Sequence, residues 1–244
     1  MEWTQRFYAR QDDWSSVYQG QTQPHHHERA TLIPRLASPP PGRVLELGAG
    51  GGQHAAATAD AGYTVTAVEI QPGAAANARR LAETRPGLSV IEGDFYVAEI
   101  PGPFDVVTYW DGFGIGSDAD QQRLLKRIAA WLSPDGVALV DTYTPWYAAQ
   151  SAGHGWPVGE AHREYGFDAE GCRWLDTWRR GEETVTQSLR CYSPADLRLL
   201  LHGTGLTMEA LEPGGGMDWD ARSWQPRAAL SKAMSFTAVL RPAR

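Results

Sequence analysis

The sequence predicts an α/β protein with a doubly wound, mostly parallel sheet and a small antiparallel β insertion. A short apolar run, Val44 to Leu47, precedes a glycine-rich turn and then a helix-forming run, Gln53 to Ala57. Strand-like and helix-like runs alternate from there to about residue 141, which is typical of parallel sheets. Residues 142–191 interrupt this order with polar and apolar residues in alternation, which indicates antiparallel hairpins.

Length and composition favour a globular protein. The 244 residues suit one α/β domain with an insertion, and 42% of them are hydrophobic. The net charge of −7 argues against a nucleic acid partner, because phosphate backbones demand basic patches. No apolar run is long enough to span a membrane, and the polar N-terminus does not resemble a signal peptide. Cys172 and Cys191 form no metal pattern, so we expect a cytoplasmic protein with reduced thiols.

The glycine turn distinguishes two ligand classes. A dinucleotide fingerprint requires Gly or Ala where this chain has Gln53. The chain instead reads E-x-G-x-G-x-G from Glu46 to Gly52, which resembles the first motif of the class I S-adenosylmethionine (SAM) dependent methyltransferases. SAM carries an ammonium and a sulfonium rather than a phosphate, so an acid at the strand end suits it. A structural glycine turn in another α/β protein is the alternative.

This resemblance implies a seven-stranded sheet closed by an antiparallel C-terminal hairpin, and it assigns residues to the cofactor. Glu69 ends a second predicted strand, residues 65–69, where a carboxylate can accept both ribose hydroxyls. Asp94 and Phe95 follow a third strand, residues 88–92, and match the positions that contact adenine. The residues assigned to SAM are Glu46, Gly48, Ala49, Gly50, Glu69, Ile70, Asp94, Phe95 and Trp110.

The segment after the fourth predicted strand, residues 104–109, is where this family places substrate and methyl group. The Asn/Asp-Pro-Pro-Tyr motif of enzymes that methylate amino groups of DNA and amides of proteins is absent from Trp110 to Gly116. Asp111 is the one ionisable residue there that can orient an acceptor or take its proton. We therefore assign it as the catalytic residue; the alternative is an aspartate that only caps a turn.

Aromatic residues at both flanks of the predicted site suggest substrate contacts. Residues 1–30 are expected to form a lid, although their aromatic residues could simply dock the segment on the core. The insertion, residues 142–191, occupies the place where small-molecule N-methyltransferases of the amino-sugar and glycine type carry one. Residues 1–141 and 192–244 would then form the SAM-binding domain. The predicted substrate-binding residues are Trp14, Tyr18, Phe113, Tyr143, Trp146 and Tyr147.

The remaining elements complete the expected fold. Three histidines, His25 to His27, open a helix predicted to run to about residue 37. Successive helical residues point about 100° apart, so these histidines cannot converge on one metal and no metal is predicted. They indicate either a solvated helix start or one histidine near the substrate. Further predicted elements are an amphipathic helix at 118–131, a strand at 137–140 after an L-x-P-x-G turn, a helix at 193–204, and strands at 206–211 and 234–240.

The function predicted from this resemblance is methyl transfer from SAM to a small-molecule acceptor, through an amine or a hydroxyl. SAM is intrinsically reactive, so the protein mainly positions the acceptor and excludes water, and no catalytic triad is expected. One alternative is a SAM-binding enzyme that cyclises or cleaves SAM. Another is a non-catalytic nucleotide-binding module. A homodimer is possible, and the sequence does not identify the acceptor.

Overall fold

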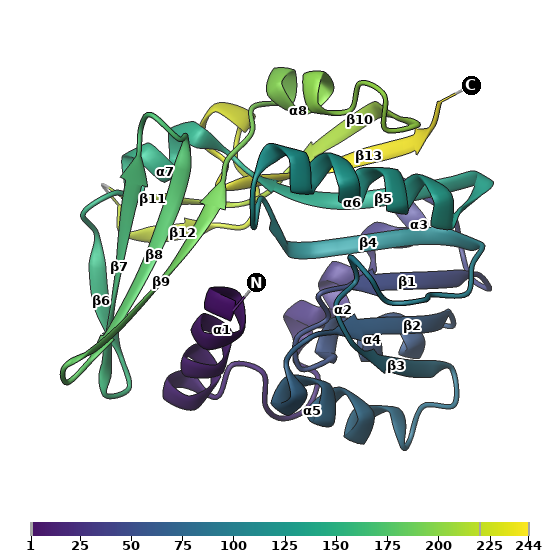
Figure 1. Ribbon diagram of the computed structural model, residues 1–244, viewed down its shortest axis with the longest axis horizontal. Coiled ribbons are helices and arrows are strands. Elements are labelled where there is room, and N and C mark those ends of the chain that lie inside the picture. The colour runs from purple at the N-terminus through teal and green to yellow at the C-terminus, as the bar shows by residue number, and fades with distance from the viewer. Residues whose placement is uncertain (1, 220, 244) are drawn as a thin grey trace.

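The computed structural model describes residues 2–219 and 221–243, and a seven-stranded sheet lies at the centre of this part of the chain (Figure 1). The strand order is β10-β13-β5-β4-β1-β2-β3, and β13 is antiparallel to both of its neighbours. The strands are β1 (Arg43–Leu47), β2 (Thr64–Glu69), β3 (Leu88–Glu92), β4 (Phe104–Phe113), β5 (Leu132–Tyr143), β10 (Leu206–Pro213) and β13 (Ser235–Pro242). The predicted doubly wound, mostly parallel fold is confirmed.

Helices cover both faces of this sheet, because successive strand residues point to opposite faces. Val44 packs in a cluster with residues of α3, α4 and α5, whereas Leu45 packs in a second cluster with residues of α6 and α8. Both side chains are fully buried, as expected for strands covered on two faces. The helices are α2 (Pro24–Ala30), α3 (Leu32–Leu36), α4 (Gln53–Asp60), α5 (Pro72–Ala82), α6 (Asp118–Trp131) and α8 (Pro194–Leu200).

Several predicted boundaries are wrong. The helix expected over residues 25–37 is two helices, which meet at Thr31. Strand β4 continues to Phe113 instead of ending at Tyr109, with a register irregularity over this stretch. The segment that was expected to follow the fourth strand is therefore partly an irregular strand end, a feature that local sequence does not specify.

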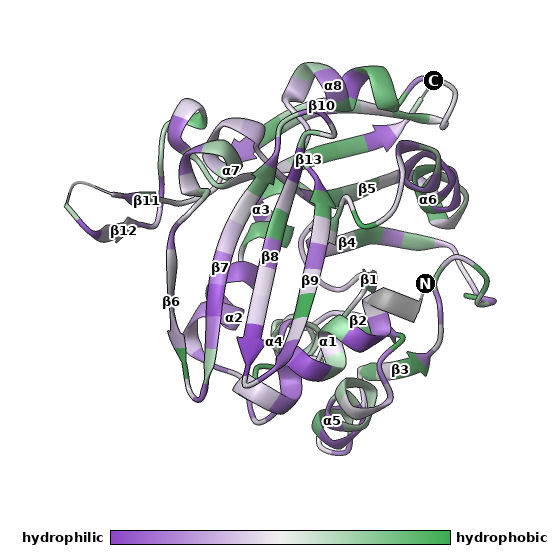
Figure 2. Cartoon of the chain, turned by 60° about the vertical axis from the view of Figure 1, so that its left-hand side comes forward, coloured by the Kyte–Doolittle hydropathy of each residue, from purple (hydrophilic) through white to green (hydrophobic). Residues whose placement is uncertain are grey.

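The insertion forms a separate four-stranded antiparallel sheet, β6-β7-β8-β9. Its strands are β6 (Gly155–Val158), β7 (Ala161–Asp168), β8 (Arg173–Arg180) and β9 (Glu183–Arg190), preceded by α7 (Pro145–Ser151). The antiparallel hairpins predicted within residues 142–191 are confirmed. A further hairpin, β11 (Gly216–Asp218) with β12 (Ser223–Gln225), extends away from the body of the molecule (Figure 2). The division of the chain into a SAM-binding domain and a cap remains a prediction.

Helix α1 (Glu2–Ser15) lies between the insertion sheet and the main domain (Figure 1). Its buried residues Phe7 and Trp14 pack against Trp178 and Val185 of the insertion sheet. Arg10 adds an exposed ion pair to Glu183 of β9, with 2.8 Å between Nε and Oε1. The helix therefore docks on the insertion sheet. In the described part of the chain, no helix combines the length and apolar character needed to cross a membrane.

Candidate functional site

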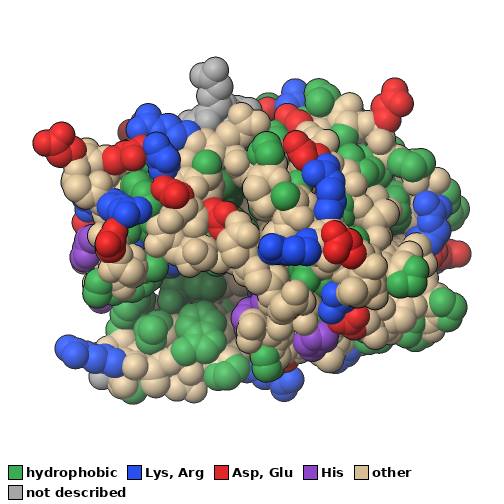
Figure 3. Space-filling model, turned by 90° about the horizontal axis from the view of Figure 1, so that it is seen from below, with side chains coloured by type: hydrophobic (Ala, Val, Ile, Leu, Met, Phe, Trp, Pro, Cys, Tyr) green, Lys and Arg blue, Asp and Glu red, His purple; other side chains and the backbone are tan. Residues whose placement is uncertain are grey.

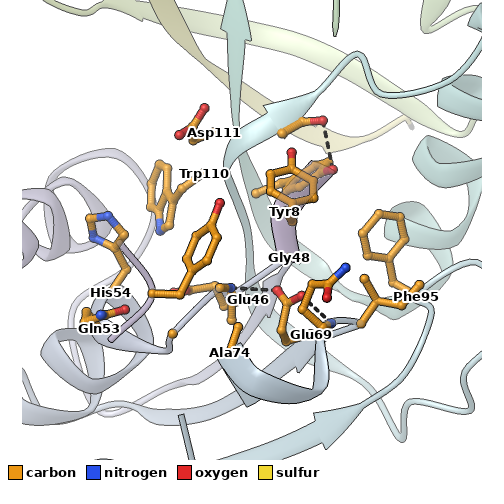
Figure 4. A pocket seen from close by; sticks show the side chains of 18 of the residues that line it. Tyr8, Glu46, Gly48, Gln53, His54, Glu69, Ala74, Phe95, Trp110 and Asp111 are labelled. Carbon is orange, nitrogen blue, oxygen red and sulfur yellow. Dashed lines mark hydrogen bonds between the residues drawn. The ribbon is translucent and has the colours of Figure 1, made fainter. Parts of the chain in front are cut away.

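A cavity of about 350 Å³ opens where β1, β2 and β4 end (Figure 4). This volume falls within the usual range of small-molecule sites, and the carboxyl ends of parallel strands are where open α/β folds bind ligands. The residues that line it are Thr4, Tyr8, Val17, Tyr18, His25, His26, Glu46, Gly48, Ala49, Gly50, Gly51, Gln53, His54, Glu69, Ile70, Gln71, Ala74, Asp94, Phe95, Tyr96, Tyr109, Trp110, Asp111, Gly112 and Ile115.

The glycine turn forms the floor of this cavity. Gly50 has φ +55°, a left-handed conformation that favours glycine, and a Cβ there would lie 2.9 Å from the Tyr18 ring. A Cβ on Gly51 would lie only 2.0 Å from the Tyr18 carbonyl oxygen. The turn therefore needs glycine both for its own conformation and for the close approach of the segment after α1. Asn77 Nδ2 bonds Gly51 O at 2.6 Å and Gly20 O at 3.2 Å, which ties that segment to the turn.

Glu69 holds the turn from the end of β2. Its Oε2 accepts the Gly50 N–H at 2.7 Å, and its Oε1 accepts the Gln71 N–H at 2.7 Å (Figure 4). Burial raises the pKa of Glu69, and the hydrogen bonds from Gln71 and Gly50 oppose that shift. Each carboxylate oxygen keeps a free lone pair, so Glu69 can still accept ligand hydroxyls.

Glu46 is the second acid of the cavity, and it is nearly inaccessible to solvent, at 1% exposure. Its Oε2 finds no hydrogen-bond partner within residues 2–219 and 221–243. Burial raises the pKa of Glu46 to about 8, opposed by the Ala55 backbone and by Arg29. A buried acceptor without a partner is costly, so this oxygen indicates a place for a ligand donor or cation.

Asp111 lies at the irregular end of β4 with φ +53°, which is uncommon for a residue other than glycine. Backbone strain of this kind often accompanies functional sites. The Tyr143 hydroxyl, at the end of β5, donates a hydrogen bond to Asp111 Oδ1. The Asp111 side chain is exposed to the open cavity, yet desolvation by the surrounding residues raises its pKa, and this hydrogen bond opposes the rise; Asp141 raises the pKa further, while Arg29 and Arg163 lower it.

Sequence reasoning missed Arg29, which links α2 to this end of the sheet. Arg29 pairs with Asp141, whose Oδ1 accepts the Thr237 hydroxyl at 2.5 Å. Its guanidinium also lies 5.1 Å from the centroid of the Trp110 ring, a cation–π distance. Arg29 thereby packs on the ring of Trp110, a predicted cofactor residue. A single arginine in a short helix carries no sequence signal for such a role.

Two of the three consecutive histidines reach the cavity, together with His54, which the sequence did not single out. His26 and His54 have ring centroids 4.6 Å apart, and those of His25 and His26 are 3.9 Å apart. Burial, the largest cause, lowers the pKa of His26 to about 4 and that of His54 to about 3, so both rings are neutral at pH 7. No group of three or more metal-ligating side chains occurs among the described residues.

All nine predicted cofactor residues line the cavity, and so do Asp111 and Tyr18. Tyr8, missed by the sequence reasoning, joins them from α1. The other predicted substrate residues lie elsewhere: Trp14 packs on the insertion sheet, and Phe113 is buried in the main core beside Tyr192. Phe113 follows the irregular end of β4, so its direction could not be inferred from strand alternation. Tyr143, Trp146 and Tyr147 pack in an aromatic cluster beneath the insertion sheet.

Comparisons with known proteins agree with this arrangement. The profile of a family described as a methyltransferase domain matches residues 18–211. In solved structures, the fold is similar to that of the CcbJ methyltransferase from Streptomyces caelestis, with a TM-score of 0.72, 21% identity and 91% of each chain covered. It is also similar to SAM-bound CalS10, an amino pentose methyltransferase from Micromonospora echinaspora, with a TM-score of 0.62, 19% identity and coverage of 89% and 90%.

One curated relative is the dTDP-3-amino-3,6-dideoxy-alpha-D-glucopyranose N,N-dimethyltransferase of Streptomyces fradiae. It is 31% identical over 143 residues, which cover 54% of this chain. The match spans about half the length of that relative, 55%. Because the family profile covers most of the sequence, the chain belongs to the methyltransferase-domain family. The resemblance to class I SAM-dependent methyltransferases is confirmed.

Proposed function

We propose that this protein transfers a methyl group from SAM to an amine nitrogen of a small-molecule acceptor. The observation that carries the choice of an amine is the charge of the cavity. Four acids line it, and no Lys or Arg does among the described residues; Glu46, whose pKa burial raises to about 8, becomes negatively charged only when a cation binds beside it. His26 and His54, whose pKa values are lowered to about 4 and about 3, add no positive charge at neutral pH. Such a cavity attracts cations such as ammonium groups.

The residues present fit SAM. Glu46 offers a buried carboxylate oxygen without a partner in the described chain, which suits the amino group of the cofactor. Glu69 retains lone pairs for two ribose hydroxyls. Phe95 lies at the opposite side of the cavity from His54, where an adenine ring would meet the Phe95 ring (Figure 4), and the neighbouring Asp94 also lines the cavity. When bound, SAM supplies an electrophilic methyl group.

Asp111 is the residue that we infer to handle the proton of the acceptor. Its carboxylate can hold an amine N–H and take the proton that nitrogen loses as it gains the methyl group. Desolvation raises the pKa of Asp111 above its ordinary value, which makes the carboxylate a stronger base. Tyr143 fixes the carboxylate from the side of β5. Tyr8 and Tyr18 cover the cavity from the N-terminal segment and help to exclude water.

The named chemistry of the relatives supports an amine on a sugar. The Streptomyces fradiae enzyme is an N,N-dimethyltransferase of a nucleotide-linked amino sugar, and CalS10 is an amino pentose methyltransferase. We therefore infer that the acceptor is an amino sugar or a similar hydroxylated amine. Tyrosine hydroxyls and carboxylates, which border the site, are common partners of sugar hydroxyls.

The test is incubation of the purified chain with methyl-labelled SAM and a panel of amino sugars, followed by mass spectrometry of acceptor and cofactor products. Methylated acceptor and S-adenosylhomocysteine in equal amounts are expected. Consumption of SAM with no methyl group on any acceptor would instead indicate cyclisation or cleavage of SAM. SAM binding without turnover on any acceptor would favour a non-catalytic module.

A further inference from the structure

Strand β8 turns one row of large side chains away from solvent. Trp174, Asp176 and Trp178 are buried, at 5%, 5% and 2% exposure, whereas the residues between them are more exposed. This alternation places the three side chains on one face of the insertion sheet. The face lies toward the main domain and α1, because the Trp174 ring lies 4.9 Å from that of Tyr143 and Trp178 packs with Phe7.

Both tryptophans of this row have an indole N–H with no hydrogen-bond partner in residues 2–219 and 221–243. Buried polar groups are rarely left unpaired, and an indole has only this one donor. Two such donors occur four residues apart on one strand face, which corresponds to roughly 14 Å along an antiparallel strand. The pair indicates a surface whose partner is a ligand with several oxygen atoms.

An acid with spare acceptor capacity lies between the two donors. Asp176 receives two hydrogen bonds from Arg163, Nε to Oδ1 at 2.8 Å and Nη2 to Oδ2 at 2.7 Å. The guanidinium is held among the rings of Trp156, Tyr165 and Trp178, at 5.5, 4.9 and 5.2 Å from their centroids. This bidentate pair fixes the Asp176 carboxylate and leaves lone pairs on both oxygens.

The row adjoins the catalytic cavity at two points. Tyr143, whose ring meets Trp174, donates its hydroxyl to Asp111 of the cavity wall. Tyr8, another lining residue, receives a hydrogen bond from Gln187, which is opposite Asp176 in the register of β8 and β9. Seen from below, the molecule is hollowed, and hydrophobic side chains line the hollow (Figure 3). The row therefore lies directly behind the part of the cavity wall that Tyr8 and Asp111 form.

We propose that Trp174, Asp176 and Trp178 form a recognition strip for the hydroxylated ring of the acceptor. The indole N–H groups donate to ring or hydroxyl oxygens, Asp176 accepts from a hydroxyl, and the aromatic faces pack against the apolar side of the ring. The strip determines which amines are methylated, whereas Asp111 acts on the amine itself. This inference rests on the proposed amine methylation. It adds how the protein recognises the part of the acceptor that lies away from the amine nitrogen.

The test follows the indole N–H signals of the ¹⁵N-labelled wild-type chain by NMR, with S-adenosylhomocysteine present. The probes are 3-amino-3-deoxyglucose and cyclohexylamine, which share a ring-borne amine but differ in hydroxyl groups. We expect the sugar to shift the signals of Trp174 and Trp178 while cyclohexylamine leaves them in place. The signal of Trp219 serves as the internal reference: its indole N–H also has no partner among the described residues, and its half-buried ring stacks on His154.

Variants make the same comparison by activity. Trp174→Phe removes the N–H donor and keeps an aromatic ring, and Trp219→Phe is the matched control outside the strip. We expect Trp174→Phe to raise the KM for the amino sugar about three- to tenfold, with KM for cyclohexylamine unchanged. Sugar binding that leaves both strip signals unmoved, or no sugar binding at all, overturns the strip. Equal shifts of the Trp174 and Trp178 signals with the sugar and with cyclohexylamine also overturn the strip. Methyl transfer with no preference for the sugar overturns the strip alone, whereas SAM consumed without methylated product overturns the proposed function.

Discussion

The Tyr143 hydroxyl donates a hydrogen bond to the Asp111 carboxylate, joining the ends of two neighbouring parallel strands. Each residue ends or nearly ends its strand, β5 for Tyr143 and β4 for Asp111. The contact stabilises the ionised form of Asp111, which desolvation alone disfavours. It also fixes which carboxylate oxygen is left for an acceptor.

Tyr143→Phe removes this donor and keeps the ring. The pKa of Asp111 then rises, because the hydrogen bond that lowered it is lost. We expect the acidic limb of the kcat profile to move about one pH unit higher, equal to about 1.4 kcal/mol, so kcat falls most on the acidic side of the profile. SAM affinity stays unchanged. Tyr147→Phe, a buried tyrosine outside the cavity lining, is the control and leaves the pH profile in place; equal profiles for both variants contradict the prediction.

Asp111→Asn tests the proposed base directly. Asn tolerates the left-handed backbone that this position adopts, so the fold is retained. We expect kcat to fall about 10²- to 10⁴-fold, the usual contribution of a positioned acid or base. The dissociation constant of SAM and the melting temperature change little. A folded variant that binds SAM and retains full kcat would show that methyl transfer depends on positioning alone.

The main sheet could be predicted from local patterns. The residue patterns of β1, β3 and α6 each favour one type of secondary structure. The observed β3 and α6 begin and end at the predicted residues. The strand-end acids Glu46 and Glu69 followed from the same order of elements, because parallel strands bring their carboxyl ends to one edge. The cofactor part of the cavity could therefore be predicted from the sequence.

The acceptor side of the cavity was much harder to predict, because tertiary contacts determine which residues line it. Trp14 and Tyr18 are four residues apart near the end of α1, yet one packs on the insertion sheet and the other lines the cavity. Tyr8 and His54 reach the cavity through packing between distant segments. The irregular end of β4 directs Phe113 into the core. No residue pattern within a single element carries that information.

Glu69→Ala should weaken SAM binding by about 1.5–3 kcal/mol, the range for hydrogen bonds to a charged group. It removes the proposed ribose contact and also frees the Gly50 N–H, which the carboxylate holds at 2.7 Å. Calorimetry measures the affinity, and thermal unfolding checks that the turn has not collapsed. Glu92→Ala is the matched control, because Glu92 is paired with Glu69 in the sheet register but lies outside the cavity lining. Equal affinities for the Glu69 variant and the wild type would remove Glu69 from the cofactor site.

Glu46 should make the stability of the ligand-free protein depend on pH. Burial raises the pKa of Glu46 from 4.5 to about 8, so the folded protein keeps a proton that the unfolded chain releases. The free energy of unfolding therefore has its full Glu46 contribution below about pH 4.5 and loses it as pH rises toward 8, at up to about 1.4 kcal/mol per unit. Denaturant unfolding at several pH values measures this slope. The neutral isostere Glu46→Gln should remove it.

The same proton reports on the cofactor. If Glu46 pairs with the SAM amino group, binding at pH 7 favours the carboxylate, and the protein releases up to one proton more than Glu46→Gln does. Calorimetry in two buffers with different heats of ionisation counts these protons. Equal proton counts for wild type and Glu46→Gln would contradict the contact. A stability slope that disappears in Glu46→Gln, together with equal proton counts, would leave Glu46 as a buried neutral acid that SAM does not ionise.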